Sequence, residues 1–343
     1  MSNIFSGLIR KVSRFSLAAI DLTDLAIAQA RPLLGARAPV KERLLGDRPL
    51  EGARKVAVFN HFDSRGVVHD YVVYFVKHLA DAGYAVIFAS NCPKLSEEQT
   101  AKVRPYVSRV LKRRNLGWDF GAFKDAIDVI PDPAALEHLL ITNDSIYGPL
   151  QDLSEVISKA DPEVASIWGL TDNWDQQFHL QSYFLIFHQA ALQHPSFGRF
   201  WQKVRYYRRK RWVIRDYEIG LTRYFLRAGL HCRALLPYRS LIAELAQPLE
   251  VVVPERDKSP VAGYLRLVKS SLHNGTPLNQ THYFWDYLIT TKLCPFIKRD
   301  LLQRNPVGVP YVQRWEEVVR SASTYDTSMI VHHLQLSMRN RVH

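Results

Sequence analysis

The amino-acid sequence predicts an α/β protein with a largely parallel sheet, and three observations support this fold class. Short apolar runs alternate four times with segments of helical character between residues 54 and 150, which is the pattern of a Rossmann-like sheet. Polar loops follow these runs, at the strand ends where open α/β sheets bind their ligands. With 343 residues, of which 47% are hydrophobic and 23% charged, the chain is long enough to bury a substantial core.

The alternating part of the chain supplies its elements in order. Four short apolar runs, each followed by polar residues, predict strands at residues 56–59, 84–89, 107–111 and 139–141. Helical periodicity over residues 69–82 ends at Gly83, a typical C-cap. Ser96, followed by two glutamates, predicts the start of the next helix, and the glycine-containing loop 116–121 predicts the start of a third.

After Pro149 the alternation is less regular. Apolar runs predict strands at residues 165–170 and 179–187. Helical patterns cover residues 197–207 and 216–228, and the second of these stops at Gly229. The last twenty or so residues are expected to be helical or frayed.

The N-terminal segment predicts an amphipathic helix. Residues 4–29 carry apolar side chains at three- and four-residue steps, with basic residues between them. Such a helix suits an anionic membrane surface, and it equally suits packing on this protein or on a partner. Residues 32–39 have the composition of a linker. Asp21 and Asp24 interrupt the apolar stretch that a secretion signal needs, and no apolar run is long enough to span a bilayer.

The charge balance predicts an anionic partner. The formal net charge is +12, and nucleic acid, anionic lipid and nucleotide diphosphates all qualify. The basic run at residues 203–212, interleaved with aromatic residues, is compatible with RNA, with a lipid diphosphate or with a solvated helix face. Because no RNA- or DNA-binding signature accompanies it, we expect no nucleic-acid partner. The three cysteines, Cys92, Cys232 and Cys294, stand far apart, which favours a reducing compartment and argues against a zinc site.

Two motifs predict where an anionic ligand binds. Gly117, Asp119 and Gly121 form a GxDxG loop at a predicted helix start, where backbone N–H groups favour an anion, although such glycines also simply shape turns. Asn143-Asp144-Ser145 follows a predicted strand, and aspartate oxygens there suit Mg²⁺ or Mn²⁺ carrying a diphosphate, although the same residues form ordinary turns. Together the two motifs point to a nucleotide-sugar site.

Three further side chains are candidates for chemistry. His282 could supply a distant metal ligand, although a lone histidine is more often structural. Asp172, with Asp175 and His179 close in sequence, could bind sugar hydroxyls or act as a base, or could belong to a solvated loop. Glu218 stands near the start of a predicted helix, where a carboxylate also complements the helix dipole.

Five sequence blocks resemble the rhamnan synthesis protein F family of bacterial glycosyltransferases. They lie at residues 117–127, 141–150, 169–173, 179–187 and 281–306. The resemblance covers roughly residues 54–306, and the order of the blocks makes it specific for the family and less specific for the sugar.

The resemblance implies a GT-A-like fold, similar to that of family 2 glycosyltransferases. This is a Rossmann-type mixed sheet flanked by helices, here with an N-terminal amphipathic helical arm and a C-terminal helical extension. It divides the chain into an arm and linker over residues 1–50, a core over 51–250, and an extension over 251–343 that completes the active site.

The resemblance also implies a set of nucleotide contacts at the ends of the first four strands. These are Asn60, Asp63, Asn91, Asn115, Gly117, Asp119, Asn143 and Asp144. The fourth strand end carries a DxD metal motif in the family, whereas Asn143-Asp144-Ser145 stands here, so the motif is degenerate. Asp144 is the best remaining ligand for a divalent cation, Mg²⁺ or Mn²⁺, with His282 as a candidate second ligand.

The same resemblance implies a general base. Family 2 enzymes place a catalytic aspartate at the start of a helix that ends in glycine about eleven residues later. Glu218 stands eleven residues before Gly229 and is therefore the implied base, with Asp172 as the reserve candidate. Such a base takes the proton of the acceptor hydroxyl while the sugar is transferred with inversion.

We therefore expect a rhamnosyltransferase that uses a nucleotide-diphosphate donor, with dTDP-rhamnose favoured and a GDP-sugar possible. The implied acceptor is a growing cell-surface polysaccharide of O-antigen or rhamnan type on a lipid carrier. The protein would then lie in the cytoplasm, on the inner face of the plasma membrane. The alternative is a non-catalytic protein of the same assembly machinery that binds nucleotide sugars or acts as a scaffold.

Overall fold

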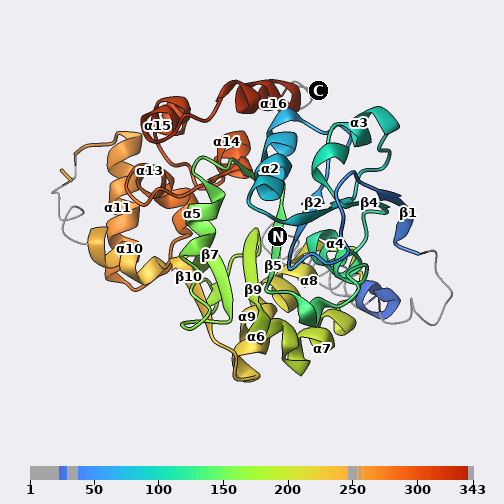
Figure 1. Cartoon of the computed structure of the whole chain (residues 1–343). Coiled ribbons are helices and arrows are strands. Elements are labelled where there is room, and N and C mark those ends of the chain that lie inside the picture. Colours follow the sequence, from blue (N-terminus) through green and yellow to red (C-terminus); the bar gives the residue numbers. More distant parts are fainter. Residues whose placement is uncertain (1–22, 29–37, 246–252, 255, 339–343) are drawn as a thin grey trace, which may run out of the picture.

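A mixed sheet flanked by helices forms the centre of the molecule (Figure 1). The computed structural model describes residues 23–28, 38–245, 253–254 and 256–338. Within them the sheet has nine strands in the order β1-β4-β3-β2-β5-β9-β7-β10, with β8 paired to β7. The strands are β1 (Val40–Leu45), β2 (Lys55–His61), β3 (Ala85–Ser90), β4 (Arg109–Arg113), β5 (His138–Asn143), β7 (Ile167–Asn173), β8 (His179–Leu180), β9 (Phe184–His188) and β10 (Cys232–Leu236).

The predicted fold class is confirmed. Strands β4, β3, β2 and β5 lie side by side and parallel, as the alternation of strands and helices predicts. Strand β9 runs antiparallel between β5 and β7, so the whole sheet is mixed. The apolar pattern predicts one strand over residues 179–187, but the structure has two separate strands there, β8 and β9. In the gap between them, the Thr171 hydroxyl is hydrogen-bonded to Gln181 Oε1 at 2.6 Å and to the Tyr183 hydroxyl at 2.7 Å.

Strand β1 is not predicted by the sequence pattern. It pairs antiparallel with β4 at the edge of the sheet. Its side chains are mostly exposed, so it lacks the apolar run that identifies the other strands. Most of the predicted helix at residues 4–29 lies outside the described residues, and residues 23–28 within it are helical.

Alternate residues of β2 build two cores, one on each face of the sheet. Ala57 and Phe59 pack on the face that helix α2 (Asp70–Asp81) covers. Val56 and Val58 pack on the other face. That second face is covered by helices α4 (Trp118–Ile127), α7 (Pro195–Lys203) and α9 (Ile219–Arg227).

Shorter helices connect these layers. They are α3 (Glu97–Ala101), α5 (Leu153–Ser158), α6 (Gln189–Gln193), α8 (Lys210–Val213), the π-helical turn Ile214–Glu218 and the 3₁₀ turns Arg104–Tyr106, Pro133–Ala135 and Val312–Arg314. The predicted cap at Ser96 is confirmed, since its side chain accepts a hydrogen bond from the Gln99 N–H at 3.2 Å. No helix within the described residues has the length and apolar content needed to cross a bilayer.

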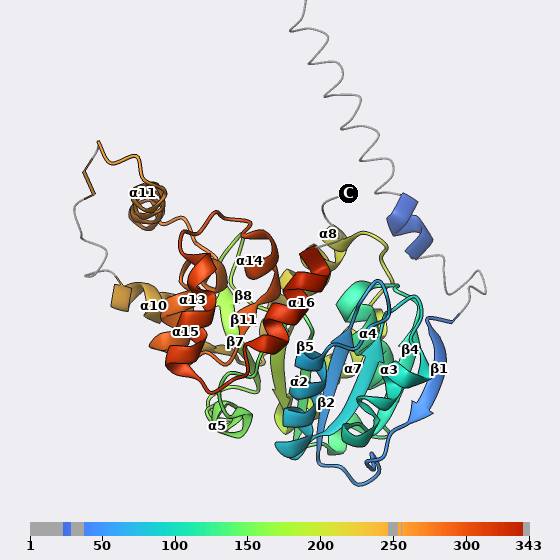
Figure 2. The ribbon, with the colours of Figure 1, turned by 90° about the horizontal axis from the view of Figure 1, so that it is seen from above.

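The C-terminal part of the chain is helical and gathers on the side of the sheet away from β1 (Figures 1 and 2). Its helices are α10 (Tyr238–Leu245), α11 (Pro260–His273), α12 (Gln280–Tyr283), α13 (Trp285–Thr290), α14 (Arg299–Arg304), α15 (Trp315–Ala322) and α16 (Ser328–Met338). The last of these, α16, returns to pack on α2.

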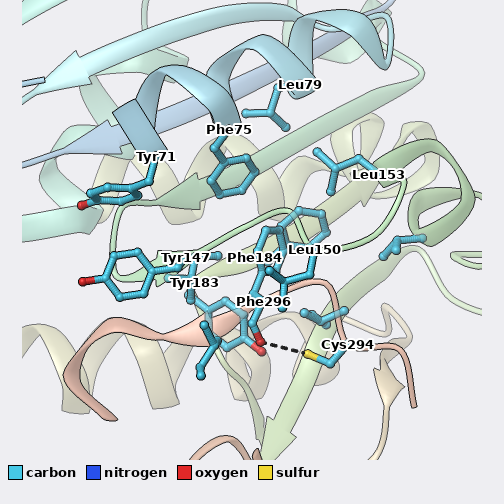
Figure 3. Close-up of a cluster of buried hydrophobic side chains, with 14 of the residues drawn as sticks. Tyr71, Phe75, Leu79, Tyr147, Leu150, Leu153, Tyr183, Phe184, Cys294 and Phe296 are labelled. Carbon is cyan, nitrogen blue, oxygen red and sulfur yellow. Dashed lines mark hydrogen bonds between the residues drawn. The ribbon is translucent and has the colours of Figure 1, made fainter. Parts of the chain in front are cut away.

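A two-strand pairing ties this C-terminal part to the end of β5. Strand β6 (Ile146–Tyr147) pairs antiparallel with β11 (Ile297–Lys298). Phe296, directly before β11, packs in the core, where its ring lies 4.9 Å from the Phe75 ring and 5.4 Å from the Phe184 ring, centroid to centroid (Figure 3). The pairing therefore holds residues 298–300 beside the loop that follows β5.

Gly148 is expected to be essential for this pairing. Its φ is +136°, and a Cβ atom there would lie 2.4 Å from the Pro295 carbonyl oxygen. We expect Gly148→Ala to lower the free energy of unfolding by about 1–3 kcal/mol, because it adds backbone strain and a steric overlap. Gly308→Ala is the matched control, since its φ is +62° but nothing lies within 4 Å of an added Cβ. Urea unfolding of both variants would measure the difference, and equal costs would show that the contact with Pro295 is unimportant.

Candidate active site

The parallel strands carry polar residues to one edge of the sheet, where a cleft opens. Its larger part is a cavity of about 460 Å³, and an adjoining part has about 160 Å³. The two parts share wall residues from β5, α4, α8, the π-helical turn, α14 and nearby loops: Asp119, Asn143, Ser145, Ser182, Lys210, Ile214, Glu218 and Arg299. The cleft therefore lies at the carboxyl ends of the strands, where the sequence predicts the ligand.

Predicted nucleotide contacts at three strand ends bond to one another around Asp119. The Asp119 carboxylate accepts hydrogen bonds from the Asn60 side chain at 2.6 Å and from the Asn143 side chain at 3.1 Å. Asn91 in turn donates to the Asn60 Oδ1 atom at 3.2 Å. Burial raises the pKa of Asp119 to about 6, and the negative charge of Asp144 acts in the same direction. These asparagines therefore use several of their hydrogen bonds to hold the Asp119 carboxylate in the wall of the cleft.

A buried ion pair is hydrogen-bonded to this network through Asn91. Arg113, at the end of β4, is fully buried, and its Nη2 atom lies 2.7 Å from Asp125 of α4. The same guanidinium donates to the Asn91 side chain and, at 3.3 Å, to the Leu116 carbonyl oxygen. Arg113 therefore links β4, α4 and the loop before α4. No sequence signal indicates this role, because a lone arginine after an apolar run is usually a strand boundary.

The first glycine of the GxDxG loop, Gly117, is packed against its neighbours and does not line the cleft. Gly117 has φ +75°, and a Cβ there would lie 3.0 Å from both the Gly121 Cα and the Tyr206 ring, so close packing requires glycine. The next residue, Trp118, and the nearby Asn115 do line the smaller cavity. The Trp118 indole N–H donates to the Arg208 carbonyl oxygen at 2.9 Å. Trp118 is not among the predicted site residues, although its place in the GxDxG loop could have identified it.

Asp63 is not brought to the cleft. Its Oδ1 atom accepts hydrogen bonds from the backbone N–H groups of Arg65 at 2.8 Å and Val67 at 3.1 Å. Its Oδ2 atom lies 3.5 Å from the His69 ring. These bonds outweigh burial and keep the pKa of Asp63 well below its usual range. Asp63 therefore shapes the loop after β2, and its predicted nucleotide contact has no support in this geometry.

Asp144, the predicted metal ligand, is paired with an arginine. Its Oδ2 atom accepts hydrogen bonds from Arg299 Nη1 and from the Phe62 backbone N–H, each at 3.1 Å. Arg299 Nη1 also donates to the Tyr71 hydroxyl at 2.9 Å. A positive side chain thus stands beside the carboxylate at the place expected for a cation.

The donor set does not fit a resident divalent cation. His282, the second predicted ligand, lies in the wall of the larger cavity, with its Nε2 atom 3.2 Å from Asp300. Asp144 borders the smaller cavity and is already neutralised by Arg299. Across the part of the chain that the structure describes, no group of three or more His, Cys, Asp or Glu side chains could hold a metal ion.

Glu218, the predicted base, lies in the wall of both parts of the cleft. It is the last residue of the π-helical turn and the N-cap of α9, and Gly229 follows that helix with φ +86°. Its carboxylate is half-buried and has no hydrogen-bond or ion-pair partner within the described ranges. A partly buried, unpaired carboxylate in a cleft is able to accept a proton from a bound hydroxyl.

Asp172, the reserve candidate, lies outside the cleft walls. Its Oδ1 atom accepts hydrogen bonds from the Tyr238 backbone N–H at 2.6 Å and the Gln280 side chain at 3.0 Å. Its Oδ2 atom accepts one from the Trp174 indole N–H at 3.1 Å. Asp172 thus joins β7 to α10 and α12, and both of its oxygens are occupied. This geometry gives it a structural role.

Four lysine and arginine side chains in the cleft are not among the predicted site residues. Lys210, Lys298 and Arg304 join Arg299 in the wall of the larger cavity. The Lys298 ammonium lies 3.7 Å from the centre of the Tyr183 ring. Burial lowers the pKa of Lys298 to about 8, and the charge of Lys210 acts in the same direction. These residues belong to the basic run at 203–212 and to the sequence block at 281–306. Both segments are far from β5 in sequence, so the sequence does not show that they line the same cleft.

Two curated proteins are similar to the chain over about two thirds of its length. The uncharacterized protein y4gN of Sinorhizobium fredii is 26% identical over 235 residues, covering 67% of this chain and 61% of that protein. The chain thus spans less than two thirds of that relative. Virulence protein VirA of Vibrio anguillarum is 26% identical over 222 residues, covering 63% of this chain and 69% of that protein.

Solved structures give weaker likenesses. The galactosyltransferase LgtC, solved with donor and acceptor sugar analogues, aligns over 79% of this chain and 98% of its own with 12% identity and a TM-score of 0.36. The fold class follows from the order and direction of the strands in the sheet. The model of one family matches the sequence directly, over the segment from β3 to the end of α10. That family is rhamnan synthesis protein F, and its model matches residues 86–248 of the chain.

Proposed function

We propose that the protein is a glycosyltransferase that moves a sugar from a nucleotide-diphosphate donor to a saccharide acceptor. One observation carries the proposal: an unpaired carboxylate, Glu218, shares the walls of one cleft with Lys210, Lys298 and Arg299. Sugar transfer needs both halves of this arrangement, a base for the acceptor hydroxyl and positive charge for the departing diphosphate. The family match over residues 86–248 supports the same reaction class.

The donor is proposed to lie across both parts of the cleft. Trp118 and Asn115 in the smaller part suit the nucleoside, because an indole offers a face for stacking and an amide offers hydrogen bonds. The diphosphate then reaches Lys210 and Arg299, which border both parts. The sugar and the acceptor occupy the larger part, where Gln181 and other polar side chains can bind hydroxyls.

The proposed chemistry is a single displacement with inversion. The acceptor hydroxyl oxygen attacks C1 of the donor sugar as its proton passes to the Glu218 carboxylate. The bond between C1 and the diphosphate oxygen breaks at the same time, and the electron pair leaves with the diphosphate. The cations in the cleft wall stabilise the charge that develops there.

Rhamnose is the proposed sugar, with dTDP-rhamnose as the favoured donor and a GDP-sugar as the other candidate. The family name supports this choice. The proposed acceptor is a growing O-antigen or rhamnan-type chain on a lipid carrier. The net charge of +12 supports attachment to an anionic membrane surface on the cytoplasmic side.

A thermal-shift panel tests the proposed function. Each nucleotide sugar is added to the full chain with Mn²⁺ or with EDTA, since a ligand that binds only the native state raises the unfolding midpoint. Selective stabilisation by dTDP-rhamnose or a GDP-sugar is expected, and it names the donor. A panel without any shift, or a shift with RNA instead, would remove the support for this function.

The affinity for a nucleoside diphosphate is expected to fall at alkaline pH. Lys298, whose pKa is about 8, must carry its proton to attract the diphosphate, so above that pH binding requires proton uptake. Affinity should therefore decline by up to about tenfold per pH unit from about pH 8 upward. Asp119 and Asp300, whose pKa values are about 6 and about 2, stay ionised across this range and add no opposing step.

Calorimetric titration of dTDP, UDP and GDP from about pH 7 to about pH 9.5 would measure this dependence. Lys298→Met is the control, since it should bind more weakly and lose the decline above about pH 8. A flat profile for the unmodified protein would mean that Lys298 does not contact the diphosphate.

A further inference from the structure

Arg299 stands where the family resemblance implied a metal ion. One nitrogen of its guanidinium, Nη1, is fixed by Asp144 Oδ2 at 3.1 Å and by the Tyr71 hydroxyl at 2.9 Å. Its Nε and Nη2 groups have no partner among the residues described, and the side chain borders both parts of the cleft. A positively charged group with free donors is therefore held at the wall where the diphosphate is proposed to lie.

The backbone fixes this arrangement before any ligand binds. The Arg299 N–H donates to the Ser145 carbonyl oxygen at 2.9 Å, directly after the β6–β11 pairing. Asp144 is held in turn by the Phe62 N–H at 3.1 Å. The guanidinium and its carboxylate are thus anchored from both sides, and a preorganised cation stabilises developing charge without reorganising during the reaction.

Adding a divalent ion here would be unfavourable. An ion bound to Asp144 would lie within a few ångströms of the Arg299 guanidinium, and like charges so close repel strongly in a partly buried site. The ion would also compete with Arg299 for the same oxygen. Asp119, the neighbouring carboxylate, already receives hydrogen bonds from Asn60 at 2.6 Å and Asn143 at 3.1 Å.

We propose that Arg299, together with Lys210 and Lys298, binds and neutralises the donor diphosphate in place of a divalent cation, so that donor binding needs no metal. This inference rests on the glycosyltransferase function proposed above. Asp144 then acts as a positioning residue that aims Arg299 at the diphosphate. The leaving diphosphate gains negative charge as its bond to C1 breaks, and the three cations receive that charge.

Nucleoside diphosphate binding tests the proposal without relying on turnover. The full chain and its variants are titrated calorimetrically with dTDP, UDP and GDP, once in excess EDTA and once with Mn²⁺. We expect equal affinity in both buffers. Arg299→Gln should weaken binding about ten- to a hundred-fold, the usual effect of losing one charge-assisted hydrogen bond. Arg233→Gln, which removes an exposed arginine from β10, is the charge-matched control and should change affinity little.

The outcomes separate this proposal from the function on which it rests. Binding that requires Mn²⁺ would overturn the arginine proposal and leave glycosyl transfer intact. The absence of nucleotide binding in both buffers would overturn both. If Arg299→Gln does not fold, Asp144→Asn decides in EDTA. Weaker binding supports the proposal, because Arg299 has then lost the carboxylate that aims it at the diphosphate. Unchanged or tighter binding would show that Asp144 only repels the ligand, and it would contradict the positioning on which the proposal depends.

Discussion

Replacing Glu218 by Gln is expected to lower kcat for sugar transfer by about 10²–10⁴-fold, the usual contribution of a general base. Glutamine keeps the size of the side chain but cannot accept the hydroxyl proton. Donor affinity should remain within about twofold, because the diphosphate is bound by cations and the new amide would keep the place of the carboxylate in the cleft wall. Transfer kinetics with the donor identified by thermal shift would measure kcat, and calorimetry would measure donor binding.

Asp172→Asn separates the two candidate bases. Asp172 accepts three hydrogen bonds and lies outside the cleft walls, so its replacement should lower the unfolding midpoint and leave kcat largely unchanged. The opposite pattern, with full activity in Glu218→Gln and a large loss of kcat in a stable Asp172→Asn protein, would exchange their roles. If the protein binds nucleotide sugars and neither the unmodified chain nor any variant transfers sugar, the non-catalytic alternative is correct.

The sequence predicts the half of the site that lies on the parallel strands. Asn60, Asn91 and Asn143 can be placed together because the strands that carry them are apolar runs of clear length, and the carboxyl ends of parallel strands meet at one edge. Glu218 can be placed at a helix start because Gly229 marks the end of that helix. Local pattern and a simple topological rule are sufficient for these positions.

The other half of the site could not be predicted in this way. Arg299 lies 155 residues from Asp144 in sequence, and the β6–β11 pairing that joins them has only two residues in each strand. Strands that short show no periodicity, so nothing in the sequence indicates the pairing. The contact between Arg299 and Asp144 is therefore visible only in the folded chain. Without it, Asp144 looks like a carboxylate that needs a cation, and this is why the sequence predicts a metal there.

Arg113 is a second such residue, and Arg113→Met is expected to lower the free energy of unfolding by about 3–5 kcal/mol. Arg113 is fully buried and pairs with Asp125 at 2.7 Å, so methionine fills the space but leaves a buried carboxylate without its counter-charge. The Lys124–Asp128 pair on the same helix is the control. Its nitrogen and oxygen are 3.3 Å apart at the surface, and Lys124→Met should cost less than about 1 kcal/mol.

Adding Asp125→Asn to Arg113→Met should recover part of the lost stability, because the uncompensated charge is then removed. It should not restore the donor site. Arg113 also holds the Asn91 side chain and the Leu116 carbonyl oxygen, so the loop that carries Trp118 and Asp119 loses its support in both variants. Urea unfolding and nucleotide titration on the same preparations would measure the two effects separately. If the double variant binds nucleotide like the unmodified protein, Arg113 acts only on stability and the loop is positioned by other contacts.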